Sequence, residues 1–338
     1  MAEKKNGNLL KLKKQLKEGV LAPLYVFYGE EDYLREMYVN RVKDCVPDGG
    51  FPDFNHIKIE GRDVAWESFP MMTDKKLIHI KDSGIFQLKS GKDEASTEEK
   101  KEFWTEKFKR ISDDTVVIFD ETAVDKRSAL YKAAAKVGTV VEFTYLSEAD
   151  LVTWVVKQFL NAKKKISKEN AYYLITICDS GLASINNEIK KLIDFCDEEI
   201  YKTDIDRVVS KSMEVIVFEL TDAIMLGNTQ KAMETLADLK TVKENVFTLI
   251  YLMLSTFEKM LRVKLMNGAP QAEVASEIGV PLFVARKYIN SAKGFSEDSL
   301  VWMVRRVAEI DLAIKEGRVE EWNALEQYVA ECIYRSHK

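Results

Sequence analysis

The segment Pro23–Met37 (PLYVFYGEEDYLREM) constrains the fold more than any other stretch of this chain. Its residues Leu24–Tyr28 form a continuous apolar run, which predicts a buried strand. Gly29 ends the run, and three acidic residues then lead into a segment with the apolar spacing of a helix. A buried strand, a glycine turn and a helix start together predict the opening unit of a parallel α/β sheet.

The first 145 residues continue this alternation of strands and helices. Further strands are predicted at Phe54–Glu60, Leu77–Lys81, Thr115–Asp120 and Thr139–Phe143. Helices are predicted at Leu9–Glu18, Glu98–Ile111 and Lys126–Lys136, a loop with a short helix at Gly61–Phe69, and a polar connection at Leu88–Thr97. Strands that alternate with helices in this way indicate a parallel, doubly wound sheet.

From Ser147 onward the strand signal stops. Ser147 and Asp150 have the spacing of a capping box, and Ser167 is a second candidate helix cap. The remaining residues show helical periodicity interrupted by glycines. The fold class is therefore α/β plus all-α, with an α/β domain at 1–146, a small helical domain at 147–211 and a larger helical domain at 212–338.

The composition excludes several kinds of site. A net charge of −5 over 338 residues lacks the basic footprint of an autonomous nucleic-acid binder. The four cysteines contain no CxxC pair, so we expect buried free thiols, and three histidines are too few for a His-rich metal centre. These residues are Cys45, Cys178, Cys196, Cys332, His56, His79 and His337.

No membrane segment is predicted. The lysine-rich start lacks the apolar core of a signal peptide, and the longest apolar stretch, Val246–Phe257, is too short to span a bilayer. We therefore expect a cytoplasmic protein and interpret Val246–Phe257 as part of a buried core helix.

The turn at Gly29 occupies the position of a P-loop but lacks its chemistry. A P-loop needs a second glycine, a lysine and a Ser or Thr to hold phosphates and Mg²⁺. Here Gly29 is followed by Glu30, Glu31 and Asp32, whose carboxylates would repel a triphosphate and instead suit the positive end of the following helix. We predict a degenerate site that binds no nucleotide.

Val116–Glu121 (VVIFDE) resembles a Walker B strand. With a P-loop, its two carboxylates would hold Mg²⁺ and orient water. Without one, Asp120 and Glu121 are interpreted as a strand-end turn and a helix start.

Ala272–Asn290 has the pattern of a helix-turn-helix, with Gly279 at the turn and Arg286 and Lys287 on the second helix. The alternative is a tight hairpin inside a helical bundle. The second helix is mostly apolar, whereas a reading helix needs several exposed polar side chains, so the bundle interpretation is favoured.

Phe69, Pro70, Met71 and Met72 form an apolar group at the end of the predicted short helix. Methionine and aromatic residues at such a tip suit insertion into an apolar pocket of a partner. From residue types alone, folding of both methionines back onto the sheet is an equal alternative.

Taken together, these features resemble the delta-subunit family of bacterial DNA polymerase III, the clamp-loader subunits that open the sliding clamp. The resemblance runs over nearly the full length and is most specific in its first and last segments. It rests on Pro23–Glu36, Pro70–Asp82, Asp125–Lys136, Asn186–Leu192, Val217–Ile224 and Asp311–Glu326.

The resemblance implies an AAA+-like core and lid without nucleotide binding, followed by a collar domain that joins a five-membered ring. It also implies a hydrophobic tip that enters a clamp pocket, which maps to Phe69–Met72 here. In place of the bulkier Leu or Phe usual in the family, this chain has Met71 and Met72, and Lys75 and Lys76 replace arginines.

The expected function is therefore a non-catalytic delta subunit that binds and opens the beta sliding clamp without hydrolysing ATP. Expected partners are the clamp, delta-prime and tau/gamma-type loader subunits, and primer–template DNA within the ring. No catalytic residue, cofactor or metal is expected. The alternatives are an active P-loop ATPase of the AAA+ class and a helix-turn-helix regulator.

Overall fold

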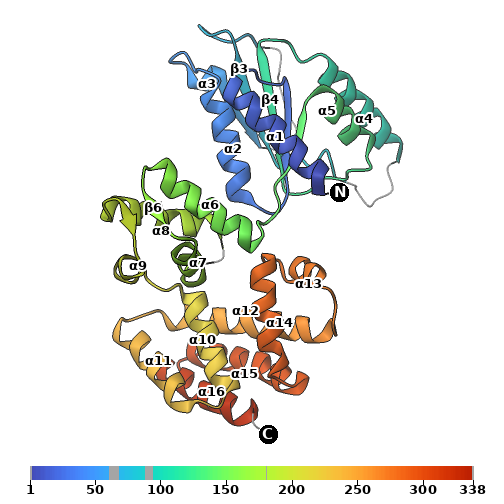
Figure 1. Ribbon diagram of the computed structural model, residues 1–338. Helices are drawn as coiled ribbons and strands as arrows, with labels where there is room; N and C mark the ends of the chain where they lie inside the picture. The colour runs from blue at the N-terminus through green and yellow to red at the C-terminus, as the bar shows by residue number, and fades with distance from the viewer. Residues whose placement is uncertain (1, 61–67, 88–93, 180, 337–338) are drawn as a thin grey trace. The chain divides into compact units, whose positions relative to one another are not determined.

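The computed structural model describes residues 2–60, 68–87, 94–179 and 181–336 (Figure 1). The chain divides into two compact units, which meet in sequence between Tyr145 and Leu146. Each unit is described by itself. The further division of the second unit near residue 211 stays a prediction. Most of the predicted loop and short helix at Gly61–Phe69 lies outside the described residues, as do His337 and the first part of the polar connection at Leu88–Thr97.

The first unit alternates strands with helices, as the apolar patterns predict. Its helices are α1 (Ala2–Glu18), α2 (Asp32–Asp44), α3 (Pro52–Asn55), α4 (Glu94–Lys109) and α5 (Ala129–Val137). Its strands are β1 (Leu24–Tyr28), β2 (His56–Glu60), β3 (Lys76–Lys81), β4 (Thr115–Glu121) and β5 (Thr139–Glu142).

The five strands form one parallel sheet in the order β2-β3-β4-β1-β5. Strand β1 is central, with Val26 in register with Phe119 on β4 and with Val140 on β5. All five residues of β1 are buried, because both faces of the sheet are covered by helices. The predicted parallel α/β sheet is confirmed.

Alternating residues of the strands divide the core of this unit into two faces. Val26, Phe119 and Ile80 pack with Trp104 and Phe108 of α4 and with residues of α5. The opposite face carries Phe27, whose ring contacts Phe143, and the Phe143 ring in turn stacks on Tyr38 of α2. Figure 1 shows α1 and α2 on one side of the sheet and α4 and α5 on the other.

Several predicted boundaries in this unit differ from the structure. The strand expected from Phe54 begins at His56, because Pro52–Asn55 form a single helical turn. Helix α4 begins at Glu94, so part of the expected polar connection is helical. Helix α5 begins only at Ala129, after Ser128, whose hydroxyl accepts a hydrogen bond from the amide of Tyr131 at 3.1 Å.

The second unit is mainly helical. Its elements are α6 (Glu148–Asn161), β6 (Lys165–Ile166), α7 (Lys168–Ile177), α8 (Leu182–Phe195), β7 (Glu199–Ile200), α9 (Lys202–Val208), α10 (Met213–Met225), α11 (Thr229–Thr241), α12 (Val246–Leu265), α13 (Gln271–Ile278), α14 (Leu282–Lys293), α15 (Glu297–Lys315) and α16 (Glu321–Ser336). The expectation of no strand after Ser147 is wrong, since β6 and β7 form a short parallel ladder. Two-residue strands are too short to show a period in the sequence.

Local capping explains where the helices of this unit begin. Ser147 and Ser167 cap α6 and α7, as predicted, by accepting hydrogen bonds from the amides of Asp150 and Asn170. The predicted buried core helix is α12, whose Leu249, Met253 and Phe257 lie in the core of α10–α16. Within the described ranges, no helix is both long enough and apolar enough to cross a bilayer.

Candidate functional site

The turn after β1, where a P-loop would lie, is closed by the chain that follows β5. The Phe143 amide donates to the Tyr28 carbonyl at 2.7 Å, and the Phe143 carbonyl accepts from the Glu31 amide at 3.1 Å. A Cβ placed on Gly29 would lie only 2.2 Å from that same carbonyl oxygen. The Glu31 amide is therefore bonded within the protein, whereas a phosphate-binding turn would direct such an amide at its ligand.

The three acidic residues of this turn have different environments. Glu30 and Asp32 are exposed, whereas Glu31 is 7% exposed. Burial raises the pKa of Glu31 to about 7, and the nearby Asp32 carboxylate adds to this shift. None of these side chains offers a positive charge to a phosphate.

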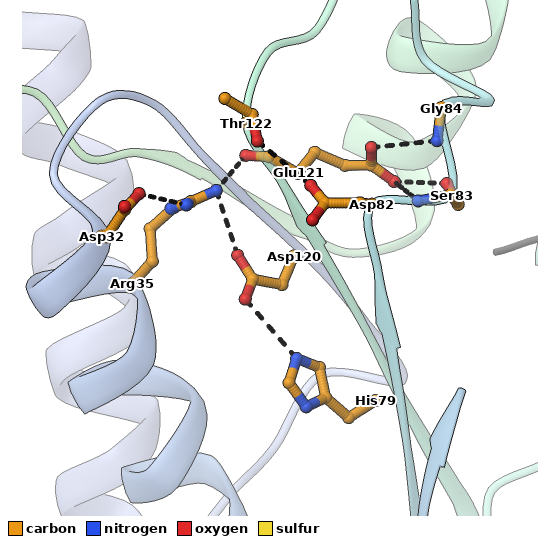
Figure 2. Close-up of polar contacts among 9 residues, drawn as sticks. All are labelled: Asp32, Arg35, His79, Asp82, Ser83, Gly84, Asp120, Glu121 and Thr122. Atoms are coloured by element: carbon orange, nitrogen blue, oxygen red, sulfur yellow. Dashed lines mark hydrogen bonds and ion pairs between the residues drawn. The ribbon is translucent and has the colours of Figure 1, made fainter. Parts of the chain in front are cut away.

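A buried arginine occupies the space between the turn and the end of β4 (Figure 2). The Arg35 guanidinium, on α2, donates to the Asp32 carboxylate and to the Glu121 carbonyl. Its Nη1 also lies 3.2 Å from Asp120 Oδ1, and Asp120 Oδ2 lies 3.6 Å from His79 Nε2. The Asp120 carboxylate thus faces an internal cation, where a Walker B aspartate would face Mg²⁺.

Glu121 is directed to the other side of β4, toward the loop after β3. Its carboxylate accepts from the amides of Ser83 and Gly84, at 3.1 and 3.2 Å, and from the Ser83 hydroxyl. Burial raises its pKa, and these hydrogen bonds oppose that rise. The expected strand-end turn and helix start at Asp120 and Glu121 is therefore wrong. Both residues belong to β4, and both are buried.

The predicted apolar tip lies in an irregular segment before β3. The side chains of Phe69 and Met72 are 84% and 81% exposed, Met71 is 39% exposed and Pro70 is half-buried. The alternative in which both methionines fold back onto the sheet is thus wrong. Exposed apolar side chains this close together are typical of a surface that meets another protein.

The predicted helix-turn-helix segment forms the hairpin α13–α14. Gly279 ends α13 in the left-handed conformation, with φ of 65°. Val284, Ala285 and Tyr288 of α14 lie in the core of the helical unit, and Arg286 and Asn290 are exposed. This arrangement supports the bundle interpretation, because the buried face of α14 is already occupied by its neighbours.

The cysteines are free, as predicted. Cys178, Cys196 and Cys332 are buried, and Cys45 is half-buried. Burial raises the pKa of Cys178 and of Cys332 to about 12, so neither thiol is a nucleophile near neutral pH. In the part of the chain that the structure describes, no group of three or more His, Cys, Asp or Glu side chains could hold a metal ion.

Comparison with known families shows to which family the chain belongs. The model for the DNA polymerase III delta subunit matches residues 25–144, and the model for the C-terminal domain of that subunit matches residues 214–332. Together they span more than two thirds of the chain. The chain belongs to the DNA polymerase III delta-subunit family.

Individual delta proteins are similar over most of their length. The Bacillus subtilis DNA polymerase III subunit delta is 27% identical, over 96% of this chain and 97% of its own. A probable delta subunit from Aquifex aeolicus is 22% identical, over 85% of both chains. The solved structure of the Bacillus subtilis DNA clamp loader delta protein has a TM-score of 0.81 at 25% identity, covering 96% of this chain and 99% of its own.

Some residues that shape the candidate site carry no distinctive sequence signal. Asn55 and Lys76 contact the backbone of Met71 and of Ser68. Asn55 is an ordinary asparagine near the start of a predicted strand, and Lys76 is a lysine in a basic pair. Arg35 follows a helical pattern in which an arginine is unremarkable. The one available signal was its position beside acidic residues, three residues after Asp32.

Proposed function

We propose that this delta-family chain binds and opens the beta sliding clamp as a non-hydrolysing subunit of a clamp loader. The observation that carries the proposal is the exposed apolar tip, in which Phe69 and Met72 are both more than 80% exposed. An aromatic ring with two flexible thioether side chains can fill an apolar pocket and contribute most of the binding energy from a few residues.

The proposed mechanism uses binding energy and needs no chemistry in this subunit. A ligand shifts an equilibrium only by its differential affinity for the two states. The tip would therefore fit the opened clamp interface better than the closed one, which disfavours closure while the tip is bound. ATP hydrolysis would belong to partner subunits of the delta-prime and tau/gamma type.

The turn at Gly29 supports the proposal that this subunit does not hydrolyse ATP. The amide of Glu31 is bonded to Phe143, and Asp120 is paired with Arg35. A triphosphate would have to break both contacts and approach three carboxylates. These observations disfavour the alternative of an active AAA+ ATPase.

Primer–template DNA is the further proposed partner, held within the assembled ring. The chain carries a net charge of −5, so any contacts should come from local lysines and arginines that meet phosphates. The same acidity, together with the buried face of α14, disfavours a helix-turn-helix regulator.

The proposal is tested by measuring binding of the full chain to its own sliding clamp, with wild type compared with Met71→Asp/Met72→Asp. Burial of two carboxylates in an apolar pocket costs several kcal/mol, so we expect affinity to fall by about 100-fold or more. The measurement is the dissociation constant from calorimetry or surface plasmon resonance.

The matched control is Leu10→Asp/Val20→Asp, which adds the same charges at two exposed apolar positions of the first unit, away from the tip in sequence. Its affinity should equal that of wild type. If Met71→Asp/Met72→Asp binds the clamp as tightly as wild type, the assignment of the tip as the clamp-binding site is rejected. Failure of wild type to bind the clamp would reject the proposed function.

A further inference from the structure

The backbone of the apolar tip is held by two buried polar side chains from other parts of the first unit. Asn55 and Lys76 are both fully buried. Asn55 is the last residue of α3, and Lys76 is the first residue of β3. Between them they contact the segment Ser68–Thr73 at two separate points.

Asn55 binds the tip through every polar atom of its side chain. Its Oδ1 accepts from the Met71 amide at 2.8 Å, and its Nδ2 donates to the Met71 carbonyl at 2.7 Å. The same Nδ2 donates to the Asp48 carbonyl at 2.8 Å. One amide group therefore ties the peptide groups on both sides of Met71 to the turn before α3.

That turn also limits where the tip can lie. A Cβ on Gly49 would be 2.5 Å from Thr73 Cγ2 and 3.1 Å from the Met72 carbonyl oxygen, so the two segments touch. Met72 itself has φ of 57°, a left-handed conformation that residues with a side chain seldom adopt. Such a conformation persists only where the surroundings hold it.

The second contact lies at Ser68, directly before the tip. The Lys76 ammonium donates to the Ser68 carbonyl and, at 3.0 Å, to the Ser68 hydroxyl. Lys76 is thus directed into the protein and is not available to a partner, whereas Phe69 and Met72 face solvent. The polar side chains order the backbone and leave the apolar ones free.

We infer that Asn55, assisted by Lys76, is a positioning residue that preforms the tip for insertion into the clamp. The inference rests on the proposed function. Methionine side chains lose rotamer entropy when they are ordered in a pocket, more than the branched or aromatic residues usual in the family. A backbone that is already ordered in the free protein loses no further entropy on binding, which partly offsets the entropy that the methionine side chains lose.

Two variants separate the hydrogen bonds of Asn55. Asn55→Ala removes all three and should weaken clamp binding about tenfold, because one or two residues must then be ordered on binding. Asn55→Asp keeps an acceptor for the Met71 amide, but its ionised carboxylate would face two carbonyl oxygens. Its binding should be weak near pH 8 and recover toward pH 5.5 as the carboxyl is protonated and can donate again.

The pH profile of Asn55→Asp is the readout that a merely structural residue would not produce. Asp48 and His56 lie beside this position in wild type too, so the wild-type profile is the reference. The matched control is Asn170→Asp, which alters an asparagine that donates to the Ile200 carbonyl in the second unit. Its clamp affinity should follow the wild-type profile.

Hydrogen exchange of the free chain provides a test that needs no clamp. Exchange of the Met71 amide should be about tenfold faster in Asn55→Ala, which lacks the acceptor, and unchanged in Asn170→Ala. If wild type binds the clamp and both Asn55 variants bind equally well with flat pH profiles, the positioning inference is overturned. If wild type does not bind the clamp, the proposed function is overturned. If exchange of the Met71 amide is the same in Asn55→Ala as in wild type, the proposal that Asn55 orders the tip is rejected.

Discussion

At the scale of single residues, Arg35 fills the space at the end of β4 where a P-loop protein would bind Mg²⁺ and phosphate (Figure 2). Arg35 is 5% exposed, and its guanidinium meets Asp32, Asp120 and the carbonyl of Glu121. Removal of one member of a buried pair leaves an uncompensated charge, so these groups depend on one another. A position that holds Mg²⁺ and phosphate in P-loop proteins is here filled by protein side chains, with one guanidinium between two carboxylates.

Glu31, in the same turn, should make the protein less stable as the pH rises. Its pKa is raised to about 7 in the folded chain, from an ordinary value near 4.5. The folded state thus binds the proton more tightly, and this stabilisation is complete below about pH 4.5 and lost as the pH passes about 7. Glu31→Gln should remove the effect and raise the free energy of unfolding near pH 8 by about 1–2 kcal/mol.

Urea denaturation of the full chain between about pH 5 and pH 8 checks this prediction. The control is Glu30→Gln, which neutralises the adjacent exposed carboxylate. Wild type and Glu31→Gln should converge at low pH and diverge as the pH rises. A constant difference across the range would contradict the prediction.

At the scale of elements, the continuation of β5 closes the turn between β1 and α2. Phe143 is the residue after β5, and its backbone bonds to Tyr28 at the end of β1 and to Glu31 before α2. The turn is therefore part of the packed structure of the sheet. In a phosphate-binding turn the amide at the position of Glu31 would face a ligand.

Gly29→Ala should be strongly destabilising because of this packing. Gly29 has φ of 120°, and an added Cβ would meet the Phe143 carbonyl at 2.2 Å. We expect a loss of about 3 kcal/mol or more in the free energy of unfolding, since a backbone strain and a backbone clash act together. Chemical denaturation provides the measurement.

Gly19→Ala is the matched control for Gly29→Ala. Gly19 also has a positive φ, of 69°, but nothing lies within 4 Å of an added Cβ. Its cost should be only about 1 kcal/mol, from the left-handed conformation alone. Similar losses for the two variants would show that the contact with Phe143 does not constrain the turn.

At the scale of the whole molecule, the chain combines two compact units that differ in architecture. The first is built on a parallel sheet, and the second contains a helical core formed by α10–α16. Both matched family models belong to the delta subunit, one for each unit. A subunit of this design can contribute by binding alone, which is the function proposed for it.

Mg-ATP should not stabilise the native chain. A ligand that binds only the folded state at 100 times its dissociation constant adds about 2.7 kcal/mol to stability, enough to raise the melting temperature by several degrees. We expect no change in melting temperature in thermal unfolding with millimolar Mg-ATP. A dose-dependent rise that is lost in Asp120→Asn would instead support an active nucleotide site.

Much of the fold could be predicted because the signals are local. The β1 strand, its glycine turn and the helix after it follow from apolar runs and punctuation within Leu24–Asp44. The Ser147 and Ser167 caps involve partners three residues away. The ladder of β6 and β7 could not be predicted in this way, because it joins two residues to two others across more than thirty positions.

The sequence predicted which residues form the tip and the acidic turn of the candidate site, but it did not predict their exposure or their contacts. Residue types and the family resemblance identified Phe69–Met72 and the acidic turn. The exposure of the two methionines, which the sequence left open, depends on the packing around the tip. The interpretation of Asp120 and Glu121 as a turn was wrong because their partners, Arg35 and the Ser83–Gly84 loop, are remote in sequence.

The sequence by itself determined the alternation of elements, the parallel sheet and the absence of P-loop residues at Gly29, because periodicity and residue chemistry act over short distances. It also showed the apolar group Phe69–Met72, whose assignment as a tip came from the family resemblance. Only the tertiary structure decided how the acidic turn is closed, which carboxylates are paired and what holds the tip. Arg35 and Glu121 are 86 residues apart, and Asn55 and Met71 are 16 apart. Contacts of this kind form only when folding brings buried polar groups together, and burial then requires them to be paired.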